Sequence, residues 1–283
     1  MERELCLSIL IVLIGGTTVL SCGWWPVGDV RESSARRLEQ IAWRQVWLPV
    51  APAIIVAAWL CGWALVEPDP VPEGAPPLLI LMSLPLAMVF ARAVIRAGWS
   101  LFGDRRDPGT ATVGLLRPWI VFSPHLAKGL DDLQIEAALA HERAHAQHRD
   151  PLRILLAQFV TDLQWPWPQA QQRLRRWLFA LELARDEEAR EAGIEGPDLA
   201  EAIVASARFR QQANLSLRAA LTGEASALKE RVKRLSQPLP IEYSRARSKT
   251  PVLVAAISSL SLAVLLGVIS GEEVISTLFR ISI

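Results

Sequence analysis

Residues 133–148 read LQIEAALAHERAHAQH, a stretch in which small apolar residues surround two histidines four positions apart. Just before it, Asp131 can cap a helix, and Gln134, three residues later, can complete a capping box. Just after it, Asp150-Pro151 can stop this helix and open the next one. The pattern therefore predicts a packed helix that begins after Asp131 and ends near residue 150.

The two histidines are His141 and His145, and Glu142 follows the first. Residues four apart project from one face of a helix, so both imidazoles can reach one metal ion while Glu142 lies beside its bound water. A zinc ion with three protein ligands keeps an open position and lowers the pKa of bound water. Glu142 is the candidate catalytic residue, because it can take the water proton and pass it to a leaving amine. A surface helix with two solvated histidines is the alternative.

A third metal ligand is expected from the segment LELARD at 181–186. Glu182 and Asp186 lie four apart, on the same stripe of a predicted helix as several leucines. A carboxylate in an apolar stripe is costly unless it is paired or binds a metal. We expect Glu182 to be the third ligand of one zinc ion and Asp186 to hold a histidine ring nitrogen. Ion pairs with neighbouring arginines are the alternative for both carboxylates.

Other polar residues are weaker candidates for this site. His148 is expected at the surface or behind the metal ligands, and His125 beside the predicted strands. Tyr243, the only tyrosine, lies in a basic tether before the last apolar segment. A tyrosine hydroxyl can stabilise an oxyanion, but this position favours a tether residue, so the oxyanion donor stays unassigned.

Composition favours a membrane protein. The chain has 283 residues, 51% of them hydrophobic, and a net charge of +1. It is more apolar than ordinary soluble domains, and it has no global positive field that would bind nucleic acid directly. Cys6, Cys22 and Cys61 lie in or beside apolar runs without paired spacing, so the sequence suggests neither a disulfide framework nor a cysteine zinc site.

Four apolar segments are long enough, or nearly so, to cross a lipid bilayer. They are residues 5–20, 46–66, 78–102 and 251–270. The third can span only if Arg92 and Arg96 snorkel to the interface beside Trp99; otherwise it is a buried or re-entrant helix. Residues 31–47 have an amphipathic pattern, which predicts an interfacial helix or a simple linker into the second span.

The placement of arginines sets the expected orientation, because short cytoplasmic loops retain basic residues. Loop 67–77 has acidic residues and no base, whereas arginines flank both ends of residues 103–250. We therefore expect a multi-pass protein of the cytoplasmic (inner) membrane with both termini outside. Its expected parts are a membrane region at 1–102, a cytoplasmic domain at 103–250, and a fourth helix with a short extracytoplasmic tail at 251–283. A cleaved signal that ends at Cys22 is the alternative for the N-terminus.

The expected cytoplasmic domain is mainly α with a small β element. Residues 110–123, TATVGLLRPWIVFS, predict two short strands or a hairpin. Helices are expected at 152–163, at 169–192 and over 198–235. Because a strand edge can align an extended peptide by strand addition, the candidate substrate-binding residues are Val113, Ile120 and Phe122.

The order of these motifs resembles the BlaR/MecR-type membrane metallopeptidases, also called antirepressor peptidases. The motifs, in order, are Phe122-Ser123-Pro124, Gly129-Leu130, His141 to His145, His148 to Leu152, a Trp-Pro region, and Glu182 to Glu187. The resemblance is close over about residues 105–235 and loose over the flanking membrane segments. It implies a gluzincin-like site in a cytoplasmic loop between the third and fourth membrane helices, with Glu182 as the third zinc ligand.

In the best-known members, an extracellular penicillin-binding sensor follows the last membrane helix, and its signal leads to cleavage of a DNA-binding repressor. Only residues 271–283 follow the fourth segment here. The resemblance therefore implies a short form that takes its input from a separate sensor protein or from the outer loop 68–77. The expected function is zinc-dependent cleavage of a protein or peptide substrate, for example a transcriptional repressor, in signal transduction. Self-cleavage is expected in the tether 236–250.

Two other functions fit the same residues. One is a non-hydrolytic, zinc-dependent signalling scaffold, against which Glu142 argues, because structural zinc needs no base. The other is a housekeeping protease for quality control of membrane proteins, which the sequence does not separate from the signalling role.

Overall fold

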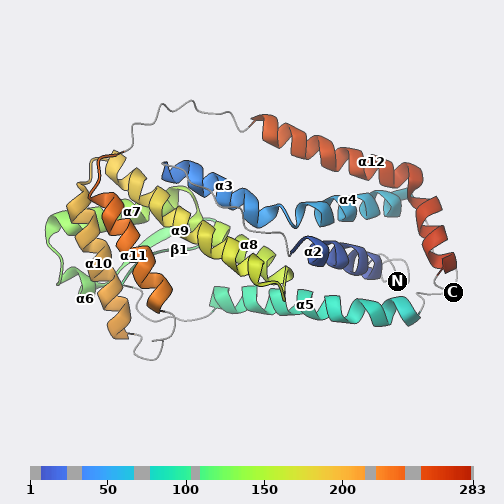
Figure 1. Cartoon of the computed structure of the whole chain (residues 1–283), viewed down its shortest axis with the longest axis horizontal. Helices are drawn as coiled ribbons and strands as arrows, with labels where there is room; N and C mark the ends of the chain where they lie inside the picture. Colours follow the sequence, from blue (N-terminus) through green and yellow to red (C-terminus); the bar gives the residue numbers. More distant parts are fainter. Residues whose placement is uncertain are drawn as a thin grey trace.

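The structure, a computed structural model, describes residues 8–23, 34–66, 77–102, 109–213, 221–239 and 250–281. These residues are mainly helical, with one two-stranded sheet, as expected from the sequence. Apolar helices gather at one end of an elongated molecule (Figure 1). The other end holds α6 (Pro124–Ala127), α7 (Asp132–Gln147), α10 (Gly196–Ala213) and α11 (Leu221–Leu235). Between the two ends lie α3 (Ala35–Trp47), α8 (Asp150–Leu163) and α9 (Pro168–Glu191).

The apolar end contains η1 (Ile11–Gly15), α2 (Gly16–Gly23), α4 (Ala51–Val66), α5 (Pro77–Phe102) and α12 (Thr250–Ile281). Helices α4 and α12 pack closely because glycines face the opposite backbone. A Cβ atom on Gly62 would lie 2.1 Å from the carbonyl oxygen of Val264, and one on Gly267 would lie 1.9 Å from that of Trp59. Small residues at such contacts are typical of helix pairs in membranes.

The length and apolarity of the described helices support one or two membrane spans. Residues Ile80–Trp99 of α5 could cross a bilayer alone. Helices α3 (Ala35–Trp47) and α4 would do so only as one pair bent by 50°, and the apolar helices Ser8–Gly23 and Ala256–Ser270 are shorter. The four-span topology and the location of the termini therefore stay predictions.

The bounds of three expected spans differ in the structure. Segment 46–66 is interrupted by a turn at 48–50, where α3 gives way to α4. The first helical segment extends to Gly23, while residues 5–7 lie outside the described residues. Helix α12 continues past the expected end at residue 270 to Ile281.

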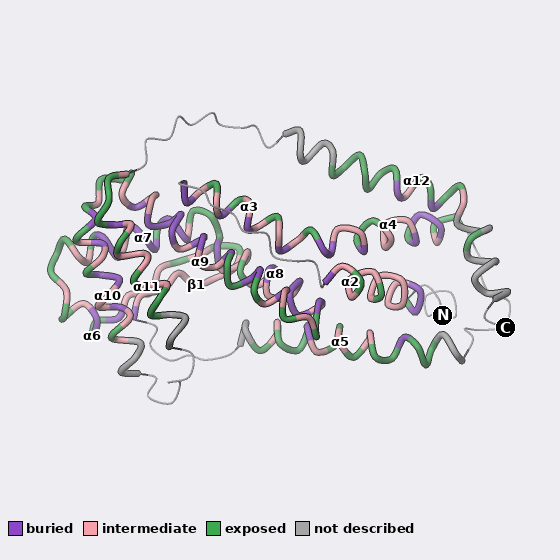
Figure 2. Tube along the Cα trace, viewed as in Figure 1, coloured by how far each residue is buried: buried purple, intermediate pink, exposed green. Residues whose placement is uncertain are grey.

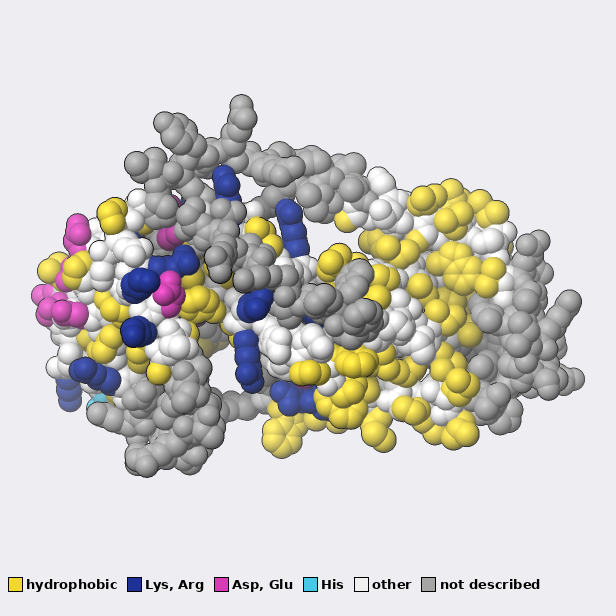
Figure 3. Space-filling model, viewed as in Figure 1, with side chains coloured by type: hydrophobic (Ala, Val, Ile, Leu, Met, Phe, Trp, Pro, Cys, Tyr) yellow, Lys and Arg dark blue, Asp and Glu magenta, His cyan; other side chains and the backbone are white. Residues whose placement is uncertain are grey.

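Hydrophobic side chains cover much of the end that holds α4, α5 and α12, whereas charged side chains lie toward the other end (Figure 3). On α5, the exposed side chains include Leu81, Met88 and Trp99. Figure 2 shows α5 and α12 largely exposed, while buried positions gather where α3, α8 and α9 meet. Such an exposed apolar surface fits contact with lipid or with a partner.

The arginines of α5 pair with a buried carboxylate of the neighbouring helix α8 (Asp150–Leu163). Nε of Arg96 donates to Oδ2 of Asp162 at 3.1 Å, and Nη1 of Arg92 lies 3.6 Å from Oδ1. The guanidinium group of Arg92 also lies 5.5 Å from the ring centroid of Trp165. The end of α5 is therefore attached to α8 through these arginines, and snorkelling of either side chain to a membrane interface stays a prediction.

Helix α3 packs against α8 and α9 and leads through a turn into α4, so its apolar face meets protein, while the expected position at the membrane interface stays a prediction. Its buried residues Ala42 and Val46 join the largest core cluster, together with residues of α8 and of α9 (Pro168–Glu191). The ring centroids of Trp43 and Trp177 are 4.8 Å apart. The apolar face of α3, residues Ala35–Trp47, is thus buried against protein.

The hairpin and the capping box form as the sequence predicts. Strands β1 (Thr110–Val113) and β2 (Trp119–Phe122) are antiparallel, with Thr110 opposite Phe122. Helix α7 (Asp132–Gln147) begins where the side chain of Asp131 accepts from the backbone N–H of Gln134 at 2.8 Å. The short helix α6 (Pro124–Ala127) was not expected.

The remaining helices fold back on α7. Arg149 joins α7 to α8 with φ 53°, a left-handed conformation that lets α8 leave at once in a new direction. The cis Trp165-Pro166 turn joins α8 to α9. The helical stretch expected over 198–235 is two helices, α10 (Gly196–Ala213) and α11 (Leu221–Leu235).

Candidate metal centre

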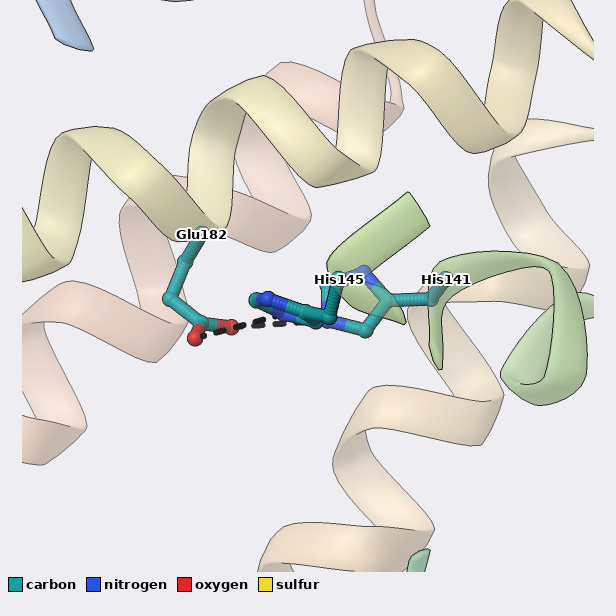
Figure 4. Close-up of side chains that lie close together, drawn as sticks. All are labelled: His141, His145 and Glu182. Carbon is teal, nitrogen blue, oxygen red and sulfur yellow. Dashed lines mark hydrogen bonds and ion pairs between the residues drawn. The ribbon is translucent and has the colours of Figure 1, made fainter. Parts of the chain in front are cut away.

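Three side chains from two helices converge on one point. His141 and His145 project from α7, and Glu182 projects from α9 (Figure 4). The Nε2 atoms of the histidines are 3.1 Å apart. Oε2 of Glu182 lies 3.5 Å from Nε2 of His141, and its Oε1 lies 3.7 Å from Nε2 of His145. The structure thus brings together the three ligands expected from the sequence.

This spacing fits a tetrahedral zinc ion. Zinc–nitrogen and zinc–oxygen bonds are about 2.0–2.1 Å long, so neighbouring ligand atoms in a tetrahedron lie about 3.3 Å apart. The three observed separations fall on both sides of this value. Both histidines are buried, whereas the side chain of Glu182 is 36% exposed. Two imidazoles and a carboxylate also suit zinc chemically and leave a fourth position for water or substrate.

His145 is oriented through its other ring nitrogen by Asp150, the fully buried first residue of α8. Nδ1 of His145 lies 2.8 Å from Oδ2 of Asp150. Arg185 donates from Nε to Oδ2 at 2.6 Å, and Arg153 donates from Nη1 to Oδ1 at 3.0 Å. Burial alone would raise the pKa of Asp150, but His145 and Arg185 lower it to about 2. Asp150 therefore stays ionised and can hold the ring.

Asp186 faces the other histidine. Its Oδ1 lies 3.0 Å from Nδ1 of His141, without the alignment of a good hydrogen bond. Arg231 of α11 donates to both oxygens of Asp186 at 2.8 Å. Nη1 of Arg231 also lies 2.9 Å from Oε2 of Glu182. One guanidinium group thus bridges a candidate metal ligand and the carboxylate behind His141.

Buried charges shift the pKa values on this side. Burial lowers the pKa of His141, but the carboxylates of Asp186 and Glu182 outweigh that effect and raise it to about 9. Burial raises the pKa of each carboxyl, yet the charge of Arg231 and the histidines hold both values below their usual range. The metal-free site therefore favours a protonated His141 between two carboxylates.

A cavity of about 330 Å³ opens beside these ligands. Glu142, which is 7% exposed, lines it on α7. Oγ1 of Thr112 in β1 lies 2.8 Å from Oε2 of Glu142. Helix α10 also lines it, with the apolar residues Leu199, Ala202 and Ile203 and with Ser206.

The candidate substrate-binding residues occupy other places. Val113, Ile120 and Phe122 are not among the residues that line the cavity, and Phe122 packs against the core formed by α7 and α10. From the hairpin, the cavity is lined instead by residues of β1 that include Ala111 and Thr112. The strand that faces the cavity is therefore β1.

The remaining candidates lie apart from the metal group, the set of candidate ligands His141, His145 and Glu182. Nε2 of His148 lies 3.0 Å from Oε2 of Glu188. His125 lies in α6, where its backbone N–H donates to Oγ of Ser123. Tyr243 lies outside the described residues, as does most of the tether. In the described ranges, His141, His145 and Glu182 form the group that could hold a metal ion.

Sequence reasoning missed the roles of Asp150 and Arg231. It used Asp150 only as a helix stop, although a carboxylate five residues after His145 could have been considered as a partner for its ring. Nothing local marks Arg231, which follows Asp186 by 45 residues.

Residues 109–235, which carry these side chains, match the model of the BlaR1 peptidase M56 family, and this segment is called the M56 domain from here on. The M56 domain runs from β1 through α11, so it contains the metal group, Asp150, Asp186 and Arg231. No curated protein and no solved structure matches the chain.

The match confirms the resemblance to BlaR/MecR-type peptidases. M56 peptidases are membrane-associated metallopeptidases. The apolar helices outside the M56 domain and the group of metal-ligand side chains within it agree with both properties.

Proposed function

We propose that this protein is a membrane-embedded zinc endopeptidase that hydrolyses peptide bonds of a protein substrate on the cytoplasmic side. One zinc ion would be held by His141, His145 and Glu182. The observation that carries the proposal is the position of Glu142, whose carboxylate shares a cavity with these three ligands. A structural zinc site is closed by four protein ligands and needs no base, so this arrangement favours an enzyme over a scaffold.

Each residue of the proposed site has its own chemical role. Bound zinc would polarise the scissile carbonyl and make water acidic enough to lose a proton near neutral pH. The carboxylate of Glu142 takes that proton and later delivers it to the nitrogen of the leaving amine. Asp150 and Asp186 hold the histidine rings so that both Nε2 atoms face one point.

An extended substrate would lie along β1. One edge of β1 pairs with β2, and residues of β1 line the cavity beside Glu142. A peptide that adds to the other edge of β1 would gain main-chain hydrogen bonds and pass beside the metal group. The substrate would thus still bind by strand addition. Ala111 and Thr112 take the place of Val113, Ile120 and Phe122 as the residues beside it.

The cellular role belongs to the same proposal. The arrangement of arginines around 103–250 favours a cytoplasmic M56 domain and termini outside the inner membrane. Relationship to BlaR/MecR-type peptidases favours a signalling role in which the substrate is a transcriptional repressor and a separate protein senses the signal. Contact with the lipid bilayer follows from the exposed apolar helices.

The test uses the full-length chain, purified in detergent, with zinc content and cleavage of unstructured proteins measured together. Glu142→Gln should retain zinc and lose at least about a hundredfold in cleavage rate, because the base is removed. Glu182→Ala should lose zinc. Glu136→Gln, an exposed glutamate on the same helix, is the matched control and should behave as the wild type.

The outcomes separate the possible functions. A wild type that binds no zinc would contradict the proposal. Stable zinc binding without cleavage of any substrate, in the presence of membrane partners, would favour the scaffold. Proteins that accumulate in cells carrying the Glu142→Gln variant would distinguish a single signalling substrate from general quality control.

A further inference from the structure

Thr112 links the strand that faces the cavity to the proposed catalytic base. We propose that its hydroxyl is a positioning group, which holds the carboxylate of Glu142 toward the metal group and couples the base to the placement of β1. The inference rests on the proposed peptidase function and deepens it. It gives a role to a residue outside the segment from His141 to His145.

The geometry gives Thr112 two acceptors on the same residue. Its Oγ1 lies 2.8 Å from Oε2 of Glu142 and 2.8 Å from the backbone oxygen of Glu142. A hydroxyl has one hydrogen to donate, and an ionised carboxylate is the stronger acceptor. Thr112 therefore donates to Oε2 when Glu142 is ready to accept a proton. Because the hydroxyl oxygen is also an acceptor, the contact can persist after Glu142 has taken the proton.

The two side chains differ in stiffness, and the stiffer one determines the orientation of the other. Thr112 is β-branched and lies in a strand, so its χ1 angle is restricted. Glu142 has a long side chain whose terminal torsion is soft. The stiffer threonine therefore orients the softer glutamate, and loss of the hydroxyl would let the carboxylate turn away from the water it must deprotonate.

The position of Thr112 in β1 adds a link to substrate. A peptide that pairs with β1 would hold this strand in place by main-chain hydrogen bonds. The same strand carries the hydroxyl that orients Glu142, so substrate binding and orientation of the base depend on one element. Positioning within a fraction of an ångström affects the rate of the chemical step more than the binding of substrate.

The same strand offers a matched control. Thr110 lies two residues before Thr112, on the same face of β1. Its Oγ1 is buried and, within the described residues, makes no hydrogen bond. Thr110→Val removes a hydroxyl of the same kind close to the site without removing a contact to Glu142.

The experiment measures kcat, KM and zinc content of the full-length protein in detergent for Thr112→Val, Thr112→Ser and Thr110→Val. Thr112→Val should retain zinc, lower kcat about ten- to a hundredfold, and change KM less than about threefold, because the lost contact orients a base. Thr112→Ser should recover most of kcat. Thr110→Val should lower kcat much less than Thr112→Val does.

A double-mutant cycle tests whether Thr112 acts through Glu142. In a Glu142→Asp background the shorter carboxylate no longer reaches the hydroxyl, so Thr112→Val should cost less there than in the wild type. Equal losses in both backgrounds, a serine variant as slow as the valine variant, or an unchanged kcat in Thr112→Val would overturn the inference. An inactive, zinc-free wild type would instead overturn the proposed function.

Discussion

Asp150 and Asp186 flank the metal group on opposite sides, but they are supported by different parts of the fold. Asp150, the first residue of α8, holds His145 and is itself held by Arg153 of α8 and Arg185 of α9. Asp186 faces His141 and is held by Arg231 of α11. One support is distributed over several residues, whereas the other depends on a single guanidinium group.

The support on the Asp150 side extends to helix α3. Arg153 forms an ion pair with Glu39 of α3, and Nε1 of Trp177 donates to the same carboxylate at 3.1 Å. The guanidinium group of Arg153 also lies 4.8 Å from the ring centroid of Trp43. Because α3 leads directly into α4, this side connects the metal group with the apolar helices.

The support on the Asp186 side ends within the M56 domain. Arg231 contacts both Asp186 and the candidate ligand Glu182. Its loss would leave the buried carboxylate of Asp186 and the partly exposed carboxylate of Glu182 without this cation at once. The comparison indicates that the Asp186 side is the more vulnerable to a single substitution, while the Asp150 side is better suited to carry an influence from the membrane helices.

The largest effect is expected for Arg231→Met. Removing one partner of a buried ion pair costs about 3–5 kcal/mol, because the remaining charge is left uncompensated. We expect a loss of that size in the free energy of unfolding of the metal-free protein, and a smaller loss in the zinc-bound protein, because the ion would neutralise part of the carboxylate charge. Chemical unfolding of the metal-free and the zinc-bound protein measures the two quantities. Arg234→Met, which removes a partly exposed pair with Glu230 on the same helix, should change stability by less than about 1 kcal/mol.

The next effect is a loss of zinc affinity, which is expected for Asp150→Asn. The amide keeps the shape but removes the charge that orients His145, and losses of such partners weaken metal binding about 10- to 100-fold. Competition with a chelator measures the change. Asp132→Asn, at an exposed position in the first turn of α7, is the matched control. If metal-free Asp150→Asn lost more free energy of unfolding than Arg231→Met, the order proposed for the two sides would be reversed.

Zinc affinity should depend on pH through the Asp186 side. The pKa of His141 is raised to about 9 in the metal-free protein, so zinc must displace a proton at lower pH. The apparent affinity should therefore rise by about tenfold per pH unit up to roughly pH 9 and level off above it. In Asp186→Asn a carboxylate that raises this pKa is absent, so the plateau should begin at a lower pH. Titration of both proteins with zinc at several pH values tests the shift.

The smallest effect is expected for Glu39→Gln, the substitution farthest from the metal group. It weakens the hold on Arg153 and should reduce zinc affinity or kcat by about two- to tenfold, because residues that act through neighbours typically contribute about 0.5–2 kcal/mol. Gln40→Ala, at the adjacent exposed position, is the control. No change in Glu39→Gln would mean that the influence of α3 does not reach His145.

The features that the sequence predicted correctly depend on residues close together in the chain. The capping box needs only Asp131 and Gln134, and the hairpin needs its strand formers and turn. His141 and His145 face the same way because a helix repeats every 3.6 residues, and Glu182 and Asp186 share a face for the same reason. These local rules located the helices that carry the proposed ligands.

The contacts that surround the proposed ligands depend on tertiary structure alone. The pairing of Arg231 with Asp186, of Glu39 with Arg153, and of Thr112 with Glu142 joins residues 30 to 114 positions apart. No local pattern marks such contacts, since they depend on which helix packs on which. Helix α3 makes the same point: its apolar face was readable from the sequence, but only the packing against α9 decided that protein covers Ala42 and Val46. Sequence periodicity thus specifies faces, and the packing of whole elements specifies their partners.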